Sequence, residues 1–127
     1  MSLTLLIPDA RRLVVQNTGV TAYVPATKIG FSQRAQGQQL PGIVINMGTV
    51  DYEATMTNAT ASTIYRVDYL VYSDTAEQTA FIHEAVKAAA LAYNSANFTI
   101  RLFDESYFVD VDLIHRSTLS CTFEYSV

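Results

Sequence analysis

The sequence has 127 residues, of which 50% are hydrophobic and 16% are charged, and its net charge is −4. This composition excludes an intrinsically disordered chain, because disordered chains bury too little apolar surface to offset the entropy lost on folding. The negative charge argues against a nucleic-acid binder that depends on bulk electrostatic attraction, and no apolar stretch is long enough to span a membrane. One cysteine, Cys121, excludes an internal disulfide framework, and the length favours one domain over residues 1–127.

The charged residues are distributed unevenly along the chain. Residues 1–34 contain four basic residues and one acidic residue, which gives +3, whereas the remaining residues contain four basic and eleven acidic residues, which gives −7. The simpler interpretation is that both segments contribute ordinary solvated surfaces. The alternative is that unlike surfaces of neighbouring copies meet.

The N-terminal segment predicts a helix over residues 8–17. Pro8 suits the first turn of a helix, where a backbone N–H has no partner, and Gly19 can end the helix in a left-handed conformation. A short extended piece is predicted over residues 21–26. One side of the helix is apolar through Leu6, Ala10, Leu13 and Val14.

Residues 27–40 have no periodicity and contain two glycines and four glutamines, so we predict a long loop. Long loops in compact domains are often functional. This one either becomes ordered when it meets a partner or is a mobile connection, and the sequence favours neither interpretation.

Two strands are predicted in the middle of the chain, over residues 41–52 and 62–72, and we expect them to pair in antiparallel fashion across a loop at residues 53–61. Pro41 suits the start of a strand, and Gly48 suits a β-bulge. In the second strand the side chains alternate, and one face is wholly apolar. That face consists of Tyr65, Val67, Tyr69 and Val71.

A second helix is predicted after Ser73 and through about residue 94. Asp74 is placed to cap it, with Glu77 three residues later. Leu91 falls on the polar side of this helix, so it is either an ordinary exposed leucine or a contact with another subunit. The predicted buried stripe consists of Phe81, Ile82, Ala85, Val86, Ala89, Ala92 and Tyr93, and the polar side of His83, Glu84, Lys87 and Asn94.

Three further strands are predicted, over residues 98–103, 107–114 and 118–125, with turns at residues 104–106 and 116–117. The order of the elements predicts an α+β fold, in which a mainly antiparallel sheet has two helices packed on one face. The inward side chains of the last strand are Leu119, Cys121, Phe123 and Tyr125, which makes the cysteine a buried small hydrophobe rather than a nucleophile.

The sequence contains no recognisable catalytic or metal-binding signature. No serine lies in a Gly-x-Ser-x-Gly elbow, and the five glycines are scattered rather than grouped in a phosphate-binding loop. A metal or hydrolytic site would have to combine His115 with nearby carboxylates, and an acidic sheet rim is the preferred interpretation. Those carboxylates are Asp104, Glu105, Asp110 and Asp112. We therefore expect no enzyme activity, metal or cofactor, and a small ligand-binding or hydrolytic domain is the alternative.

Three stretches together resemble one protein family. The first is the N-terminal helix followed by Tyr23-Val24-Pro25, a variable loop and Pro41-Gly42-Ile43-Val44-Ile45. The second is Val67-Asp68-Tyr69-Leu70-Val71-Tyr72-Ser73-Asp74 with the alanine-rich helix behind it, and the third is a closing strand that ends near Phe123-Glu124-Tyr125. In this order they resemble the tail-terminator, or tail-completion, proteins of long-tailed bacteriophages. The glutamine-rich loop and the segment 53–61 do not match that family's pattern.

The resemblance implies a structural virion protein with a single tail-terminator-like domain, which forms a hexameric ring on the head-proximal end of the tail. Such a ring ends tail-tube polymerisation and joins the tail to the head. The implied partners are further copies of the chain, the tail tube protein and the head–tail connector protein, with no membrane, no sequence-specific nucleic acid and no cofactor. The implied location is the tail or neck of the virion, after assembly in the bacterial cytoplasm. A different connector or neck component is the alternative.

A ring built head-to-tail needs two different contact patches on each subunit. We predict that these patches and the partner contacts use residues from the basic N-terminal segment, the loop at 27–40, the second helix and the acidic segment that follows it. The candidate residues are Arg11, Arg12, Lys28, Arg34, Gln36, Lys87, Leu91, Asp104 and Glu105.

Overall fold

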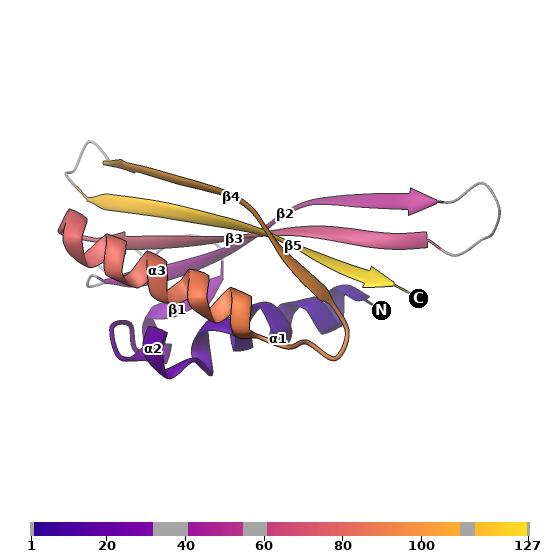
Figure 1. Cartoon of the computed structure of the whole chain (residues 1–127), viewed down its shortest axis with the longest axis horizontal. Helices are drawn as coiled ribbons and strands as arrows, with labels where there is room; N and C mark the ends of the chain where they lie inside the picture. The colour runs from indigo at the N-terminus through magenta and orange to yellow at the C-terminus, as the bar shows by residue number, and fades with distance from the viewer. Residues whose placement is uncertain (1, 32–40, 55–60, 110–113, 127) are drawn as a thin grey trace.

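A computed structural model describes residues 2–31, 41–54, 61–109 and 114–126 of the chain. Its elements are α1 (Ser2–Val15), α2 (Thr18–Thr21), the 3-10 helix η1 (Ala26–Lys28), β1 (Ile29–Phe31), β2 (Gly42–Ala54), β3 (Ala61–Ser73), α3 (Ala76–Ala92), β4 (Thr99–Val109) and β5 (His115–Ser126). The strands form one sheet in the order β1-β2-β3-β5-β4, and the two main helices, α1 and α3, pack on the same face of it (Figure 1). This confirms the predicted α+β class.

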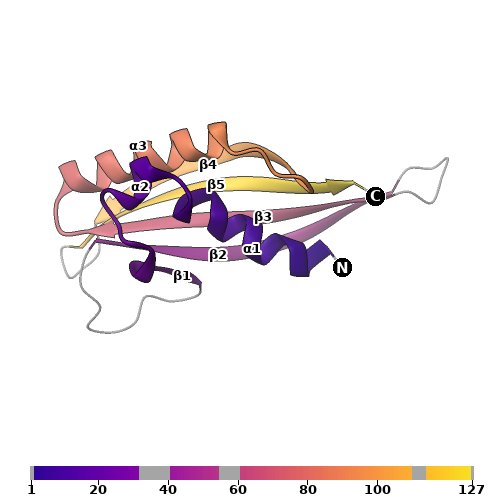
Figure 2. The same cartoon turned by 90° about the horizontal axis from the view of Figure 1, so that it is seen from below.

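The last of the described strands lies inside the sheet rather than at its edge. β5 is antiparallel to β3 on one side and to β4 on the other; β2 is antiparallel to β3, whereas β1 is parallel to β2. β1 and β4 are therefore the two edges of the sheet. In its middle, Tyr69 of β3 lies between Ile45 of β2 and Leu119 of β5. Figure 2 shows α1 lying across β2 and β3, and α3 lying along β5 and β4.

The hydrophobic core lies between the sheet and the helices. The predicted apolar face of β3 is buried, as are Leu119, Cys121 and Phe123 of β5, while Tyr125 packs at the margin of the core. Burial raises the pKa of the Cys121 thiol to about 12, as expected for a side chain that serves as a small hydrophobe. The helices contribute Leu6, Ala10, Leu13, Val14, Ile82, Val86 and Ala89.

The N-terminal helix is longer than predicted. α1 begins at Ser2, so Pro8 lies inside the helix rather than in its first turn. Proline cannot donate the helical hydrogen bond at that point. Leu6 before it and Ala10 after it are both fully buried, and this packing holds the two turns together across the missing bond.

The segment after α1 forms short helical turns instead of the predicted extended piece over residues 21–26. The Asn17 side chain caps α2 by accepting a backbone N–H at 3.2 Å, so Gly19 lies within α2 and does not end the first helix. The start of the predicted loop at 27–40 is ordered as η1 and β1, and residues 32–40 lie outside the described residues.

Strands β2 and β3 form the predicted antiparallel pair. The register shifts between Met47 and Val50, which confirms the bulge predicted at Gly48. Pairing continues to Ala54 and Ala61, so the strands extend into the predicted loop from both sides. The rest of that loop lies outside the described residues.

α3 has a different cap and a differently oriented buried stripe from those predicted. Its cap is Thr75 rather than Asp74, because the Thr75 hydroxyl accepts a backbone N–H of the first turn at 3.1 Å. Phe81 and Ala92, predicted to be buried, are exposed, whereas His83, predicted to lie on the polar side, is buried. Seven of the 17 residues in α3 are alanine, and alanine carries too little amphipathic signal to fix the stripe.

β4 is one strand where two strands and a turn were predicted. The register shifts between Leu102 and Asp104, so Phe103 forms a bulge. The turn predicted at 104–106 is wrong because these residues pair with β5, and the turn predicted at 116–117 is wrong because these residues pair with β3 and β4. Turn-forming residue types at 104–106 are tolerated here since β4 is an exposed edge of the sheet.

Candidate interaction surfaces

Most of the exposed large hydrophobic side chains belong to one helix and to the edge strand beside it. Among the described residues, six of the nine exposed large hydrophobic side chains belong to α3 or β4. We call these two elements the α3–β4 flank, with the exposed side chains Phe81, Leu91, Phe103, Tyr107, Phe108 and Val109. Phe103 and Phe108 point to the sheet face away from the helices, toward Arg66 and Arg116. Leu91 is 70% exposed and Phe103 61%. The flank also presents the outer backbone groups of an edge strand, which proteins usually protect from pairing with other chains.

Two hollows lie between α3 and β4. The larger has a volume of about 590 Å³ and lies beside the C-terminal end of α3, where Leu91, Ile100 and Leu102 contribute apolar lining. The smaller has a volume of about 420 Å³ and is lined by polar side chains that include His83 and Glu105. The salt bridge between Lys87 and Glu105 joins the helix to the strand. Both hollows therefore combine apolar and polar lining residues.

A buried histidine ties α3 to both neighbouring strands. His83 Nε2 lies 2.7 Å from Glu105 Oε1, and His83 Nδ1 lies 2.9 Å from Ser117 Oγ. Lys87 Nζ donates to the other carboxylate oxygen of Glu105 at 3.2 Å. The hydrogen bond from His83, followed by that from Lys87, lowers the pKa of Glu105. Because the ionised carboxylate only accepts, Nε2 carries a proton, and in the neutral ring Nδ1 accepts from the Ser117 hydroxyl.

The same three side chains contain the residue types of a nucleophilic triad. A Ser–His–acid triad uses a histidine to take the proton of a serine that can attack a substrate. Here the serine bonds to Nδ1 and the acid to Nε2, which reverses the usual assignment of the ring nitrogens. Ser117 is also only 4% exposed, although it contributes to the lining of the smaller hollow, and its hydroxyl bonds to the histidine ring. The three side chains therefore tie α3 to β4 and β5.

The contacts of Glu105 predict a specific change in its titration. Replacing His83 by leucine removes the ring N–H that contributes most to the low pKa and supplies no other donor, so the pKa of Glu105 should rise toward its ordinary value. NMR titration of the Glu105 side-chain carboxyl measures this. Lys87→Met is the matched control and should give a smaller rise. A pKa that moves only in the lysine variant would contradict the assignment.

Arginines stack on aromatic rings across the face of the sheet opposite the helices. The Arg66 guanidinium lies 5.3 Å from the centre of the Phe103 ring, and that of Arg116 lies 3.7 Å from the centre of the Phe108 ring. Arg66 also pairs with Asp68 at 3.1 Å. Cation–π contacts of this kind contribute on the order of 0.5–1 kcal/mol each at exposed sites. They hold the two phenylalanines of β4 in defined positions even though both rings are exposed.

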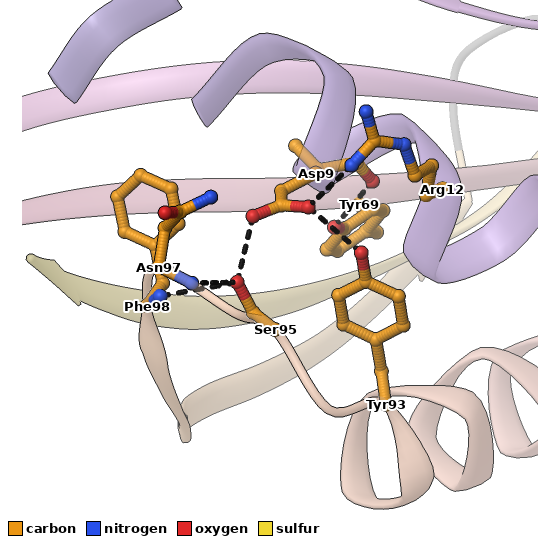
Figure 3. Close-up of polar contacts among 8 residues, drawn as sticks. Asp9, Arg12, Tyr69, Tyr93, Ser95, Asn97 and Phe98 are labelled. Carbon is orange, nitrogen blue, oxygen red and sulfur yellow. Dashed lines mark hydrogen bonds and ion pairs between the residues drawn. The ribbon is translucent and has the colours of Figure 1, made fainter. Parts of the chain in front are cut away.

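A buried carboxylate joins α1 to the end of α3 (Figure 3). Asp9 is only 2% exposed. Its Oδ1 accepts hydrogen bonds from Arg12 Nη1 at 2.9 Å and from the Tyr93 hydroxyl at 2.8 Å, and its Oδ2 accepts one from Ser95 Oγ at 2.6 Å. Ser95 Oγ in turn accepts the backbone N–H of Phe98 at 3.0 Å, just before β4 begins. This network fixes the first helix relative to the α3–β4 flank.

Sequence reasoning missed the Asp9 network because its members are far apart in the chain. Tyr93 and Ser95 lie 84 and 86 residues after Asp9. The one local signal was Arg12 three residues after Asp9, which is a helical spacing. A second long-range bond, from the buried Tyr69 hydroxyl to the Ala10 carbonyl at 2.7 Å, holds the same helix to β3, and burial raises the pKa of this tyrosine well above its ordinary value.

The sequence-predicted contact residues fall into two groups. On the α1 side, Arg11 donates to the Ala26 carbonyl at 3.3 Å, Arg12 pairs with Asp9, and Lys28 lies next to β1. The second group, on or beside the α3–β4 flank, consists of Lys87, Leu91, Asp104 and Glu105. Arg34 and Gln36 lie outside the described residues.

The region around His115 does not form a metal centre in the part of the chain that the structure describes, where no three His, Cys, Asp or Glu side chains are grouped to hold an ion. His115 Nδ1 instead bonds to the Tyr107 hydroxyl. Asp110 and Asp112, the carboxylates of the alternative interpretation, lie outside the described residues. None of the described helices is long and apolar enough to cross a membrane.

The sequence matches no family model and no curated protein. The fold does have a counterpart among solved structures. A chain in the virion of a native gene transfer agent particle superimposes with a TM-score of 0.69, and the match covers 93% of this chain and 92% of that chain at 13% sequence identity. The two chains share a fold over nearly their whole lengths.

Proposed function

We propose that this protein is a structural component of a phage-like virion. More specifically, we propose a tail-terminator-like domain that forms a ring at the head-proximal end of the tail, ends tail-tube polymerisation and joins the tail to the head connector. The observation that carries the proposal is the fold shared with a gene transfer agent virion chain over 93% of this chain and 92% of the other. The family resemblance of the sequence points in the same direction.

Two properties of the described residues suit an assembly protein. The α3–β4 flank exposes aromatic and aliphatic side chains together with a sheet edge, and such surfaces on a soluble protein mark contacts with other proteins. The serine and histidine of the Ser–His–acid arrangement at His83 are buried, and the arrangement acts as a tie between elements. Both properties favour contact between proteins over conversion of a substrate.

Light scattering tests self-assembly, with the protein alone and with purified tail tubes. We expect a closed oligomer or an oligomer that forms on the tubes. A strict monomer that does not bind tubes would contradict the proposal.

Electron microscopy of particles made without the protein then assigns the role. Overlong tubes are expected for a terminator, whereas tubes of normal length that fail to join heads would assign the protein to the connector or neck. Loss of a hydrolytic activity in His115→Ala with the fold intact would favour an enzyme instead.

A further inference from the structure

We infer that the α3–β4 flank of one copy docks against the opposite flank of a second copy, the flank formed by α1, η1 and β1. This inference rests on the proposed function, because it assigns the two contact surfaces of the proposed ring. Four features of the described residues support it: exposed side chains, sheet edges, charges and internal ties.

The α3–β4 flank has the apolar surface that such a contact needs. Leu91 and Phe81 of α3 are each more than half exposed, and Tyr107 and Val109 of β4 lie on the helix side of the same sheet edge. Burying one such side chain changes a binding constant by roughly tenfold or more. The opposite flank carries apolar counterparts in Ile7 and Tyr23, which are 41% and 45% exposed. Contact between the flanks would bury both sets.

The sheet topology gives each copy two unlike edges. β4 and β1 are these edges, and within the part of the chain that the structure describes neither has a strand on its outer side. They differ in length and sequence, and two unlike patches on one subunit produce head-to-tail contacts that can close into a ring. A contact between two α3–β4 flanks would instead bring like charges together and would close after two copies.

The two flanks carry opposite net charges. The described residues 2–31 carry a net charge of +2, from Arg11, Arg12 and Lys28 against Asp9. α3 and β4 together carry −2, from four acidic residues against Lys87 and Arg101. The opposite signs favour contact between unlike flanks and oppose contact between like flanks.

The two flanks of one copy are also tied rigidly to each other. The Asp9 network bonds α1 to Tyr93 at the end of α3 and to Ser95 before β4. The flanks are thereby held at a constant angle. In a closed ring each copy is related to its neighbour by the same rotation, and this requires a constant angle between the two contact surfaces of every copy.

The first test disrupts the α3–β4 flank. Leu91→Arg removes an exposed apolar side chain, adds a charge of the same sign as the opposite flank, and retains a good helix former. We expect self-association to weaken at least roughly tenfold. Far-UV circular dichroism should be unchanged, as should the urea midpoint at a protein concentration where both proteins are monomeric. Thr118→Arg is the matched control, since it places the same side chain on the face of β5 opposite the helices, and it should leave association intact. An effect of the control equal to that of Leu91→Arg would overturn the inference.

The second test joins the two edges covalently. On the face of the sheet opposite the helices, one row of paired residues runs from edge to edge: Gly30, Val44, Leu70, Thr118 and Ser106. A Cβ at Gly30 would have no atom within 4 Å, so Gly30→Cys is tolerated, and Ser106 is exposed. Within one copy the two ends lie four strand spacings apart, about 19 Å. That separation is beyond the reach of a disulfide, so only copies in contact can be cross-linked.

The double variant Gly30→Cys/Ser106→Cys should give a ladder of covalent oligomers on mild oxidation or with a short bifunctional maleimide. The control Gly30→Cys/Thr118→Cys should not, because position 118 lies inside the sheet. The native Cys121 is buried and does not interfere. If light scattering shows oligomers but the two double variants cross-link equally, the inference fails and the proposed function stands. If no oligomer forms, alone or on tail tubes, both fail.

Discussion

Replacing Asp9 by alanine is expected to lower the free energy of unfolding by about 3 kcal/mol. The carboxylate is buried and accepts three hydrogen bonds, from Arg12, Tyr93 and Ser95, and the substitution leaves all three donors without this acceptor. Part of the loss is offset because the Arg12 side chain is half exposed and can turn to water. Urea denaturation followed by circular dichroism measures the change.

Two variants that each remove one hydrogen bond to Asp9 provide a scale for the free-energy cost of Asp9→Ala. Tyr93→Phe removes one hydroxyl and should cost about 1 kcal/mol. Arg12→Met removes the most exposed partner and should cost less than about 1 kcal/mol, as surface ion pairs usually do. If Asp9→Ala costs no more than Arg12→Met, the network does not hold α1 in place and the rigidity inferred for the two flanks is lost.

Replacing Phe98 by alanine is expected to cost about 3–5 kcal/mol of unfolding free energy. Phe98 is 6% exposed and lies at the point where the chain leaves α3 and enters β4. Its ring packs against those of Tyr65, Phe123 and Tyr125, with centroid distances of 6.2, 5.8 and 5.6 Å. The alanine variant leaves a cavity among these rings that the strands cannot close. The same urea titration measures the loss.

Phe98→Leu is the matched control for this position, because it keeps most of the apolar volume and loses the ring contacts. A cost of roughly 1–2 kcal/mol is expected for it. Equal costs for the leucine and alanine variants would mean that ring geometry, and not filled volume, determines stability at this site. A cost below about 1 kcal/mol for the alanine variant would contradict the packing described here.

The sequence predicted best those strands that have one buried face. In β3 and β5 the inward positions are apolar at every second residue, and Tyr69 and Phe123 are among the largest fully buried side chains. Such a face fixes the register, because a shift of one residue would turn all of it to solvent. The bulge at Gly48 was also predictable, since a glycine that interrupts an alternating strand pattern commonly marks a bulge.

The sequence predicted β4 poorly for the opposite reason. This strand is exposed along most of its length, so its sequence lacks the alternation of apolar and polar residues that a buried face produces. Asp104 and Glu105 then resembled a turn, although they pair with Ser120 and Leu119 of β5. The decisive interaction is cross-strand hydrogen bonding, whose partner lies about 15 residues later and is not visible in a local window.

The candidate surfaces could be predicted only in part. Leu91 stood out because it interrupts a polar helix side, and the structure places it among the most exposed side chains. That Leu91 lies beside the edge strand that carries Phe103 depends on the strand order, since only insertion of β5 between β3 and β4 puts β4 at an edge beneath α3. Strand order arises from long-range pairing, and neither periodicity nor residue type encodes it locally.

The position of β5 has a consequence for synthesis of the protein. β3 is made early and gains β2 as a neighbour at once, but its other side pairs with a strand made about 50 residues later, as in Tyr69 with Leu119. β4 has no partner among the described strands until the same strand emerges from the ribosome. The nascent chain therefore carries two bare strand edges until β4 and β5 form a hairpin and insert together. Pairing between strands so far apart in the sequence slows folding. We therefore expect the nascent chain to need chaperones mainly before β4 and β5 have paired with β3.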